Sequence, residues 1–171
     1  MIIGGISNNI RNTILECIKR NPGIRYRELL RLLGLTNGVL SYHLYRLESE
    51  QMIRIDRDKG MTRYYVSDVE YNEAKILGML RIPTTRRIVS YMLENDGSST
   101  LDELAFMLGK APSTIFWHMK RLVEKGLVDK YDYKYVLRNK HLIAGIFARY
   151  REQLIEKVAD NYTDIMEDLN F

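Results

Sequence analysis

The chain contains the same segment twice, with the two copies 75 residues apart. Residues 11–55 align with residues 86–130 without a gap, and eight of the aligned positions are identical. The apolar positions also coincide along the alignment, which indicates the same buried face in each copy. Examples are Ile14 with Val89, Ile18 with Leu93, Leu40 with Ile115, Leu44 with Met119, and Ile53 with Val128. The repeat therefore predicts two structural units of one fold.

The first copy has the pattern of three helices and a hairpin. Its first helix is expected to end at Asn21–Gly23, where Pro and Gly stop the helical spacing, and its second to span Tyr26–Leu33. The third helix is expected to begin after the N-cap residue Thr36 and to continue to about Glu50. Polar and apolar residues then alternate over Met52–Val66 around an Asp-Lys-Gly turn, which predicts a β-hairpin.

The second copy repeats these boundary signals. Thr84 is the expected N-cap of its first helix, and Thr100–Glu103 has the capping-box pattern. Pro112 stands at the first position of the third helix, where its missing N–H costs no hydrogen bond. Leu127–Leu137 alternates but has a weaker turn signal, so a very short hairpin is expected there. Between the copies, Val69–Leu80 has the pattern of a connecting helix.

Three helices followed by a two-stranded hairpin, the wing, make up a winged helix-turn-helix domain. The expected fold class is therefore mainly α with short β-hairpins (α+β). The predicted organisation is two tandem winged helix-turn-helix domains at residues 1–68 and 84–138, a connecting helix at residues 69–83 and a C-terminal amphipathic helix at residues 139–171. In such a domain the third helix enters the DNA major groove, and the first two helices hold it at the required angle.

The third helix of the first copy has a polar face that is hardly charged. Leu40, Leu44 and Leu47 form its apolar face. The opposite face carries small polar residues and tyrosines, whereas charged residues are usual on the exposed face of a helix. Such groups near the N-terminal end of a helix can hydrogen-bond to base edges in the major groove. The residues predicted to contact bases are Asn37, Gly38, Ser41, Tyr42 and Tyr45.

Basic residues flank this helix and continue onto the hairpin. The first 68 residues carry 11 Lys and Arg against 7 Asp and Glu, and this excess favours an anionic partner. A second basic group, Arg25, Arg27 and Arg31, lies at the start of the second helix. A basic wing binds the sugar-phosphate backbone, where Lys and Arg release counterions. The residues predicted to contact the DNA backbone are Thr36, His43, Arg46, Arg54, Arg57, Lys59 and Arg63.

The segment LTNGVLSYHLYRLESEQMI, Leu35–Ile53, resembles the recognition-helix segment of archaeal ArsR/MarR-like winged-helix transcription regulators. The resemblance covers residues 8–68 closely and residues 84–138 more loosely. It implies sequence-specific binding of double-stranded DNA, usually as a dimer. Gln51 departs from the family pattern, in which a glycine precedes the wing, whereas the second copy keeps Gly126. The pattern is met by Leu35, Thr36, Leu40, Ser41, His43, Leu44, Leu47, Met52 and Ile53.

The second copy differs on the face that would read bases. Phe116 replaces Ser41, and Trp117 replaces Tyr42. Two large rings are poorly suited to reading base edges, although stacking or contact with thymine methyl groups is an alternative. We interpret the second copy as a degenerate one whose helix packs on protein, either on the other unit or on a partner subunit.

The C-terminal segment at residues 139–171 has apolar residues three and four positions apart, which predicts an apolar stripe on one long helix. The segment carries 4 Lys and Arg against 6 Asp and Glu. Homodimerisation is the first expectation for such a stripe, and packing on its own domain is the second. The residues predicted to form a protein interface are Phe116, Trp117, Phe147, Tyr150, Leu154 and Val158.

Composition limits the other classes of protein to which the chain could belong. Cys17 is the only cysteine, so neither an internal disulfide nor a paired-thiolate metal site is expected. We expect a reducing, cytoplasmic location. No uncharged run approaches the roughly 20 residues that cross a membrane. The sequence has no phosphate-binding loop or paired-carboxylate motif, so we expect no cofactor and no enzyme activity. The alternative to a regulator is a protein-interaction module of a transcription or chromosome-organising complex. No residue pattern identifies a small-molecule effector.

Overall fold

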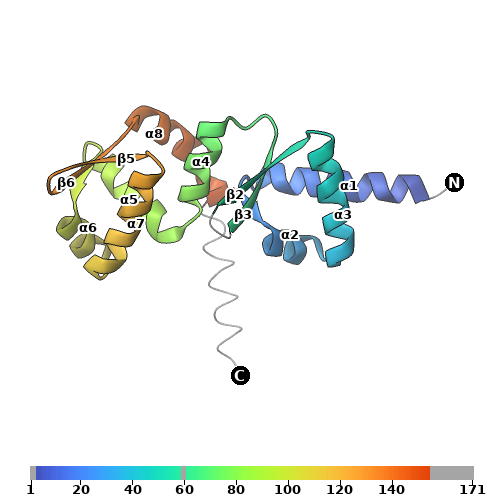
Figure 1. The fold of residues 1–171 in the computed structure, drawn as a ribbon, viewed down its shortest axis with the longest axis horizontal. Coiled ribbons are helices and arrows are strands. Elements are labelled where there is room, and N and C mark those ends of the chain that lie inside the picture. Colours follow the sequence, from blue (N-terminus) through green and yellow to red (C-terminus); the bar gives the residue numbers. More distant parts are fainter. Residues whose placement is uncertain (1–2, 59–60, 155–171) are drawn as a thin grey trace, which may run out of the picture. The chain divides into compact units, whose positions relative to one another are not determined.

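The computed structural model describes residues 3–58 and 61–154 of the 171-residue chain (Figure 1). The chain divides into two compact units, Met1–Ala74 and Lys75–Phe171, which we call unit 1 and unit 2. Each unit combines helices with one three-stranded antiparallel sheet. This arrangement confirms the predicted α+β fold class.

Unit 1 is built around a sheet that joins a hairpin, β2 and β3, to a strand far from it in the sequence, β1. Its strand order is β1-β3-β2, so β3 is the central strand. Tyr64 of β3 pairs with Ile24 on one side and with Ile55 on the other. The elements are α1 (Ile3–Arg20), β1 (Ile24–Arg25), α2 (Tyr26–Leu33), α3 (Asn37–Ser49), β2 (Ile53–Asp58) and β3 (Met61–Val66), followed by α4 (Tyr71–Leu80), which continues into unit 2.

Local signals in the sequence set the ends of these helices. The side-chain amide of Asn21 donates to the Cys17 carbonyl at 2.9 Å and closes the last turn of α1. Gly34 follows α2 with a φ of 60°, a left-handed conformation that glycine adopts without a Cβ clash. At the start of α3, Thr36 Oγ1 accepts a hydrogen bond from the Val39 N–H at 3.5 Å. The predicted span of α2 and the predicted N-cap of α3 are therefore confirmed.

The core of unit 1 fixes the orientation of α3. Ile14 and Ile18 from α1 pack in one buried cluster with Leu40, Leu44 and Leu47 from α3. Burial of each such side chain contributes about 1.5–3 kcal/mol to folding. Because the three leucines occupy one side of α3, the opposite side of the helix is directed to solvent.

Unit 2 repeats the fold of unit 1. Its strand order β4-β6-β5 matches β1-β3-β2, and Ser99 pairs with Tyr135 as Ile24 pairs with Tyr64. The prediction of two units of one fold is confirmed. The elements of unit 2 after α4 are α5 (Pro83–Glu94), β4 (Ser98–Thr100), α6 (Leu101–Leu108), α7 (Pro112–Glu124), β5 (Val128–Tyr131), β6 (Lys134–Leu137) and α8 (Lys140–Arg149).

The structure confirms most of the expected signals in unit 2 and corrects one. Thr100 and Glu103 form the capping box of α6, and Pro112 is the first residue of α7. The N-cap of α5, however, is Ile82, and Pro83 is its first helical residue. The prediction that Thr84 is this N-cap was wrong. Proline is favoured at the first helical position because its φ is already helical and its missing N–H needs no partner there.

The C-terminal segment is not one continuous helix within the described residues. α8 ends at Arg149, and Tyr150 has a φ of −107° and a ψ of 15° before a further helical turn at residues 151–154. The prediction of a single helix from residue 139 is therefore corrected at Tyr150. No Gly or Pro occurs at residues 149–151, so helical periodicity alone gave no sign of the interruption. The later part of the predicted stripe, including Val158, lies outside the described residues.

Candidate nucleic-acid interface

The exposed side of α3 carries the residues that were predicted to contact bases. Asn37, Gly38 and Ser41 are exposed, and Tyr42 and Tyr45 have 54% and 68% of their surface exposed. None of the five residues is an Asp, Glu, Lys or Arg. The surface is therefore rich in hydrogen-bonding groups and aromatic edges. Its contact with DNA remains a prediction.

A tyrosine from α2 holds this surface in place. The Tyr26 hydroxyl donates to the Asn37 carbonyl at 3.0 Å, and it lies 2.8 Å from Ser41 Oγ. Tyr26 has a single O–H, and that hydrogen is used by Asn37, so Ser41 is the donor in the second bond. Ser41 Oγ consequently presents only acceptor lone pairs to solvent. Sequence reasoning missed Tyr26, because no spacing rule connects it to a residue fifteen positions later.

His43 does not lie on the exposed face, which corrects its predicted contact with the DNA backbone. Only 5% of its surface is exposed, and its ring meets the Tyr42 ring edge-on with centroids 5.1 Å apart. Burial lowers the pKa of His43 from 6.5, and the charges of Arg11 and Arg46 lower the pKa further. A buried, neutral imidazole is not placed to bind phosphate.

The same histidine position is buried in unit 2. His118 is 7% exposed, and its Nδ1 lies 2.9 Å from the hydroxyl of the buried Thr85. Burial also lowers the pKa of His118, with a smaller effect from Arg121. The histidine that both copies share is therefore a packing residue in each of them.

The wing of unit 1 presents fewer basic groups than was predicted. Arg63 is 6% exposed and donates to the Gly23 carbonyl at 3.0 Å, so it joins β3 to the loop before β1. Arg54 is half-buried and donates to the Val69 carbonyl at 2.5 Å. The burial of Arg63 corrects its predicted backbone contact, whereas the backbone contact of the half-buried Arg54 stays a prediction. Lys59 lies outside the described residues.

Arg57 and Arg46 remain on the surface beside α3. The Arg57 side chain is 62% exposed and forms an ion pair with Glu48 at 3.3 Å. The Arg46 side chain is 49% exposed and pairs with Glu50 at 3.0 Å. A hydrogen bond to Glu50, followed by one to Tyr42, raises the pKa of Arg46. Surface pairs of this kind contribute about 0–1 kcal/mol, so a phosphate can replace the carboxylate at small cost.

Thr36 and the basic group on α2 complete the margin of this surface. Thr36 is exposed, and its hydroxyl oxygen caps α3. Arg25, Arg27 and Arg31 are all exposed as well. We call the exposed side of α3 together with Arg46 and Arg57 the α3 surface.

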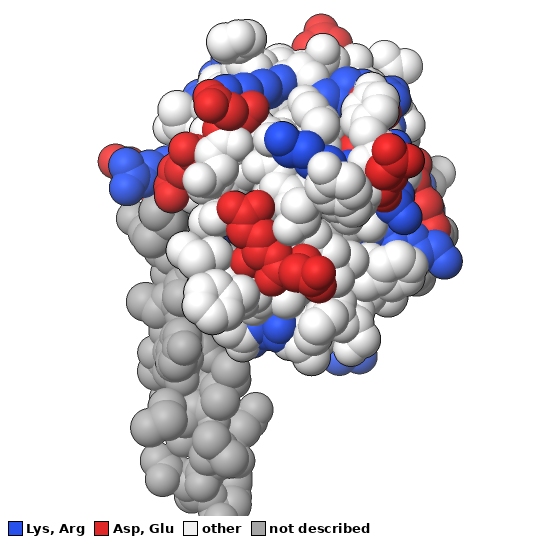
Figure 2. Space-filling view, turned by 90° about the vertical axis from the view of Figure 1, so that its left-hand side faces the viewer, with Lys and Arg blue, Asp and Glu red and all other residues white. Residues whose placement is uncertain are grey.

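The corresponding side of unit 2 is aromatic. Phe116 and Trp117 on α7 are 49% and 51% exposed, and on α6 Phe106 is 85% exposed. The Arg121 guanidinium lies 4.9 Å from the centre of the Trp117 ring. Figure 2 looks onto unit 2, where acidic and basic side chains are interspersed between broad uncharged areas. Exposed aromatic rings are compatible with a protein contact at Phe116 and Trp117, and that contact stays a prediction.

The predicted interface residues of the C-terminal segment are only partly accessible. Leu154 is 4% exposed in the single chain, which corrects its prediction as a contact residue. Phe147 and Tyr150 are half-buried. The Arg149 guanidinium lies over the Tyr150 ring, 6.0 Å from the ring centre. Packing on its own chain, the second expectation for this segment, therefore describes Leu154 better than an open dimer contact does.

The described part of the chain contains no group of three or more His, Cys, Asp or Glu side chains that could hold a metal ion. None of its helices is both long enough and apolar enough to cross a membrane.

Two family models match the chain. A model described as an N-terminal HTH domain matches residues 8–77, and a model described as winged helix-turn-helix DNA-binding matches residues 83–129. The chain therefore carries two domains of the helix-turn-helix type, one for each copy of the repeat.

Two individual proteins align with most of the chain. An uncharacterized HTH-type transcriptional regulator of Methanocaldococcus jannaschii is 28% identical over 121 residues, or 71% of this chain. The chain spans 30% of the length of that relative. The solved structure of the mRNA-binding domain of elongation factor SelB from E. coli in complex with SECIS RNA is 15% identical with a TM-score of 0.34. That match covers 76% of this chain and 98% of the other.

Proposed function

We propose that this chain is a transcription regulator that binds double-stranded DNA through the α3 surface of unit 1. The observation that carries the proposal is the combination of an exposed, uncharged polar face on α3 with exposed arginines at its margin. The two helix-turn-helix matches and the regulator among the similar proteins support it. The narrower resemblance to ArsR/MarR-like regulators is part of this proposal.

In this proposal α3 enters the major groove with its N-terminal half against the bases. Ser41 Oγ presents acceptor lone pairs, because its hydrogen is donated to Tyr26. The partner it fits is an exocyclic amino group, which the major groove presents on adenine and cytosine. Asn37 can pair with adenine in the bidentate manner of amide side chains. Tyr42 and Tyr45 are exposed farther along the same face and can contact base edges or thymine methyl groups.

The wing is proposed to lie along the sugar-phosphate backbone. Arg57 is the described wing arginine whose side chain is mostly exposed, and Arg46 lies on α3 itself. Lys59 remains a proposed backbone contact from the sequence alone. Each phosphate contact releases counterions, so affinity falls as salt rises.

The proposed assembly is a homodimer. A dimer presents two α3 surfaces to successive major grooves, and the two half-sites are then about one helical turn apart. Phe116 and Trp117 on α7 are the exposed residues of unit 2 that we propose for protein contact.

Fluorescence anisotropy with mixed-sequence duplex DNA over a range of salt concentrations tests the backbone contact. Replacement of the wing arginine, Arg57→Gln, is expected to weaken binding to all duplexes alike and to reduce the log–log salt slope by about 0.9. Lys19→Gln is the matched control, because Lys19 is an exposed α1 residue that pairs with Glu16. Equal slopes for Arg57→Gln, Lys19→Gln and the unchanged chain would remove the wing from the interface.

The second candidate function is a protein-interaction module. The exposed rings of Phe116 and Trp117 favour it, because large uncovered aromatic side chains are typical of protein contacts. This candidate predicts no salt-dependent binding to any duplex. The anisotropy titration of the unchanged chain therefore separates the two candidates.

A further inference from the structure

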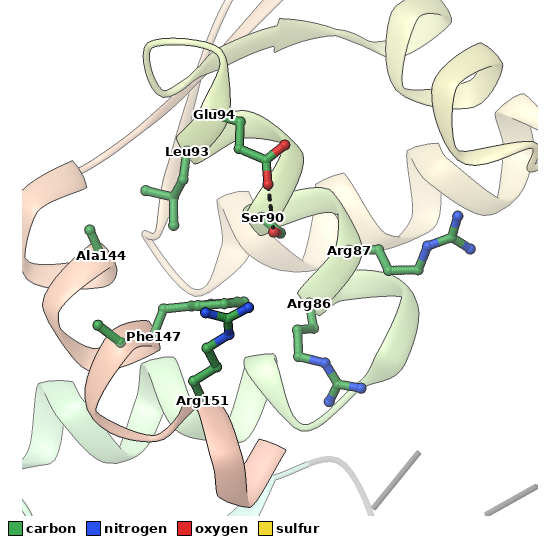
Figure 3. Close-up of a pocket in the computed structure, with 9 residues that line it drawn as sticks. Arg86, Arg87, Ser90, Leu93, Glu94, Ala144, Phe147 and Arg151 are labelled. Atoms are coloured by element: carbon green, nitrogen blue, oxygen red, sulfur yellow. Dashed lines mark hydrogen bonds between the residues drawn. The ribbon is translucent and has the colours of Figure 1, made fainter. Parts of the chain in front are cut away.

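A cavity in unit 2 lies between α5 and the C-terminal segment. Its volume is about 550 Å³, and its walls come from one face of α5, from α8 and from the helical turn at residues 151–154 (Figure 3). Pockets that hold small molecules usually measure about 300–1,000 Å³. The cavity belongs to unit 2 alone, and the predicted DNA contacts do not line it.

One part of the cavity wall is apolar. Phe147, Ala144 and Ala148 contribute from α8, and Leu93 contributes from α5. Figure 3 shows the Phe147 side chain projecting from α8 toward α5. A flat ring or a short hydrocarbon chain fits such a wall, because it buries apolar surface without leaving a polar group unsatisfied.

The charged part of the wall is strongly basic. Arg86, Arg87 and Arg151 line the cavity together with one acidic residue, Glu94. None of the three arginines forms an ion pair with a residue that the structure describes. Glu94 instead accepts a hydrogen bond from Ser90 at 3.3 Å. The cavity lining therefore carries more positive than negative charge, and Glu94 forms no ion pair with any of the three arginines.

The arginines keep donors available for a ligand. Arg86 donates to the Leu80 carbonyl at 3.3 Å, and Arg87 donates to the Leu108 carbonyl at 3.4 Å. A guanidinium has five N–H donors, so these single bonds leave most of them unused. In Figure 3, Arg86 and Arg151 lie at one end of the cavity and Glu94 lies at the other, whereas Arg87 points away from α8. Arg86 and Arg151 are therefore the two arginines at the end of the cavity away from Glu94.

Burial adds to the case for an anion at Arg86. Desolvation lowers the pKa of Arg86, and the nearby charge of Arg81 lowers the pKa further. Both effects mean that the positive charge of Arg86 is poorly stabilised by its surroundings. A bound anion would offset this cost, and arginine forms planar two-point contacts with carboxylate and phosphate groups.

We propose that this cavity binds a small organic anion, namely a carboxylate or phosphate group carried on one ring or a short hydrocarbon chain. Arg86 and Arg151 hold the anionic group, and Phe147 covers the apolar part. The proposal concerns binding by unit 2 and does not depend on the function proposed for unit 1.

Titration of the isotope-labelled full chain, followed by amide chemical shifts in NMR spectra, tests this site. The probes are benzoate and phenyl phosphate, with benzyl alcohol as the neutral ring and inorganic phosphate as the anion without a ring. At least one aromatic anion is expected to give saturable shifts confined to α5, α8 and residues 151–154. It should bind at least about tenfold more tightly than either control probe, a difference of about 1.4 kcal/mol. Which of the two binds distinguishes a carboxylate ligand from a phosphate ligand.

Variants connect the shifts to the named residues. Arg151→Gln and Arg86→Gln are each expected to weaken binding of the aromatic anion about tenfold, because each removes one charged donor. Arg149→Gln is the matched control, since Arg149 lies on α8 but does not line the cavity. No saturable shift with either anion would overturn the proposal. So would equal binding of inorganic phosphate, or full binding by both cavity variants when their spectra show a folded protein.

Discussion

Units 1 and 2 share a fold but differ at the surfaces that a winged helix presents to DNA. The wing strands β2 and β3 have six residues each, whereas β5 and β6 have four each. Two more residues per strand lengthen the wing of unit 1 by about 7 Å, and the added part carries Arg57. On the third helix, Ser41 and Tyr42 of unit 1 correspond to Phe116 and Trp117 of unit 2.

The buried positions, in contrast, are alike in the two units. Leu40 and Ile115 are both fully buried, and His43 and His118 are both buried beside an exposed aromatic ring. The comparison teaches that packing preserved the shared fold, while the exposed positions were free to change. In a fold that serves many functions, specificity is therefore to be sought on the exposed side of α3 and at the wing tip.

The largest expected effect tests whether both copies use the same core. Leu40→Ala and Ile115→Ala each remove a fully buried side chain and leave a cavity, so each is expected to cost about 2–5 kcal/mol of unfolding free energy. Urea denaturation followed by circular dichroism measures the loss. Tyr45→Ala serves as the exposed control and should cost far less. A loss well below about 1 kcal/mol for either core variant would mean that the two cores are not equivalent.

The shared histidines predict a pH dependence of stability. Burial lowers the pKa of His43 and of His118 in the folded protein, whereas the unfolded chain keeps the ordinary value of 6.5. The unfolded state therefore binds protons first as pH falls, and the unfolding free energy should decrease from about pH 6.5 downward until the folded-state pKa values are reached. Urea denaturation at a series of pH values measures this slope.

Single and double histidine variants sharpen the comparison between units. His43→Gln and His118→Gln are each expected to remove part of the pH slope, and the double variant should remove more than either alone. The measured quantity is the change of unfolding free energy with pH. A substitution that lowers stability equally at every pH therefore leaves this slope unchanged. An unchanged slope in one single variant would show that its histidine has a different role from the other.

A smaller effect is expected from the hydrogen bonds that are specific to unit 1. Tyr26→Phe removes the bonds to Asn37 and Ser41, which should cost about 0.5–1.5 kcal/mol of unfolding free energy. It also frees the Ser41 hydroxyl to donate, so the variant should discriminate less between bases at the position that Ser41 contacts. Selection of bound duplexes from a random library measures that preference.

Tyr91→Phe is the control for this variant. Tyr91 donates its hydroxyl to Glu103 at 2.8 Å in unit 2, so this change removes a tyrosine hydrogen bond away from the α3 surface. The selected sequences should then match those of the unchanged chain. If Tyr26→Phe and Tyr91→Phe selected the same sequences, Tyr26 would have no part in positioning Ser41 for base contact.

The sequence predicted the elements that depend on local signals. The span of α2, the caps of α3 and α6, and both hairpins follow from turn residues, capping residues and alternation, and the structure confirms them. The residues on the exposed side of α3 followed from the leucine spacing, because helical geometry fixes which side chains share a face.

The error at Arg63 came from a strand too short to leave a pattern in the sequence. β1 has only two residues, Ile24 and Arg25, yet it makes β3 the central strand of its sheet. Pairing of β1 with β3 brings the Gly23 carbonyl, just before β1, to the Arg63 side chain, which is buried and donates to it. His43 was misplaced for a related reason, since spacing alone did not show how far the core extends around α3. Tertiary contacts decided both cases.

The central claim is that the α3 surface of unit 1 reads DNA and the corresponding surface of unit 2 does not. Exchange of the aligned residues between units tests it most directly, with fluorescence anisotropy on a duplex selected by the unchanged chain. Ser41→Phe with Tyr42→Trp should weaken binding to the selected duplex at least about tenfold, since each lost base contact costs about 1–3 kcal/mol. Phe116→Ser with Trp117→Tyr should leave the selected DNA sequence unchanged, because these two residues are proposed to contact protein and not bases. Full affinity after the unit 1 exchange, or a changed sequence preference after the unit 2 exchange, would contradict the account.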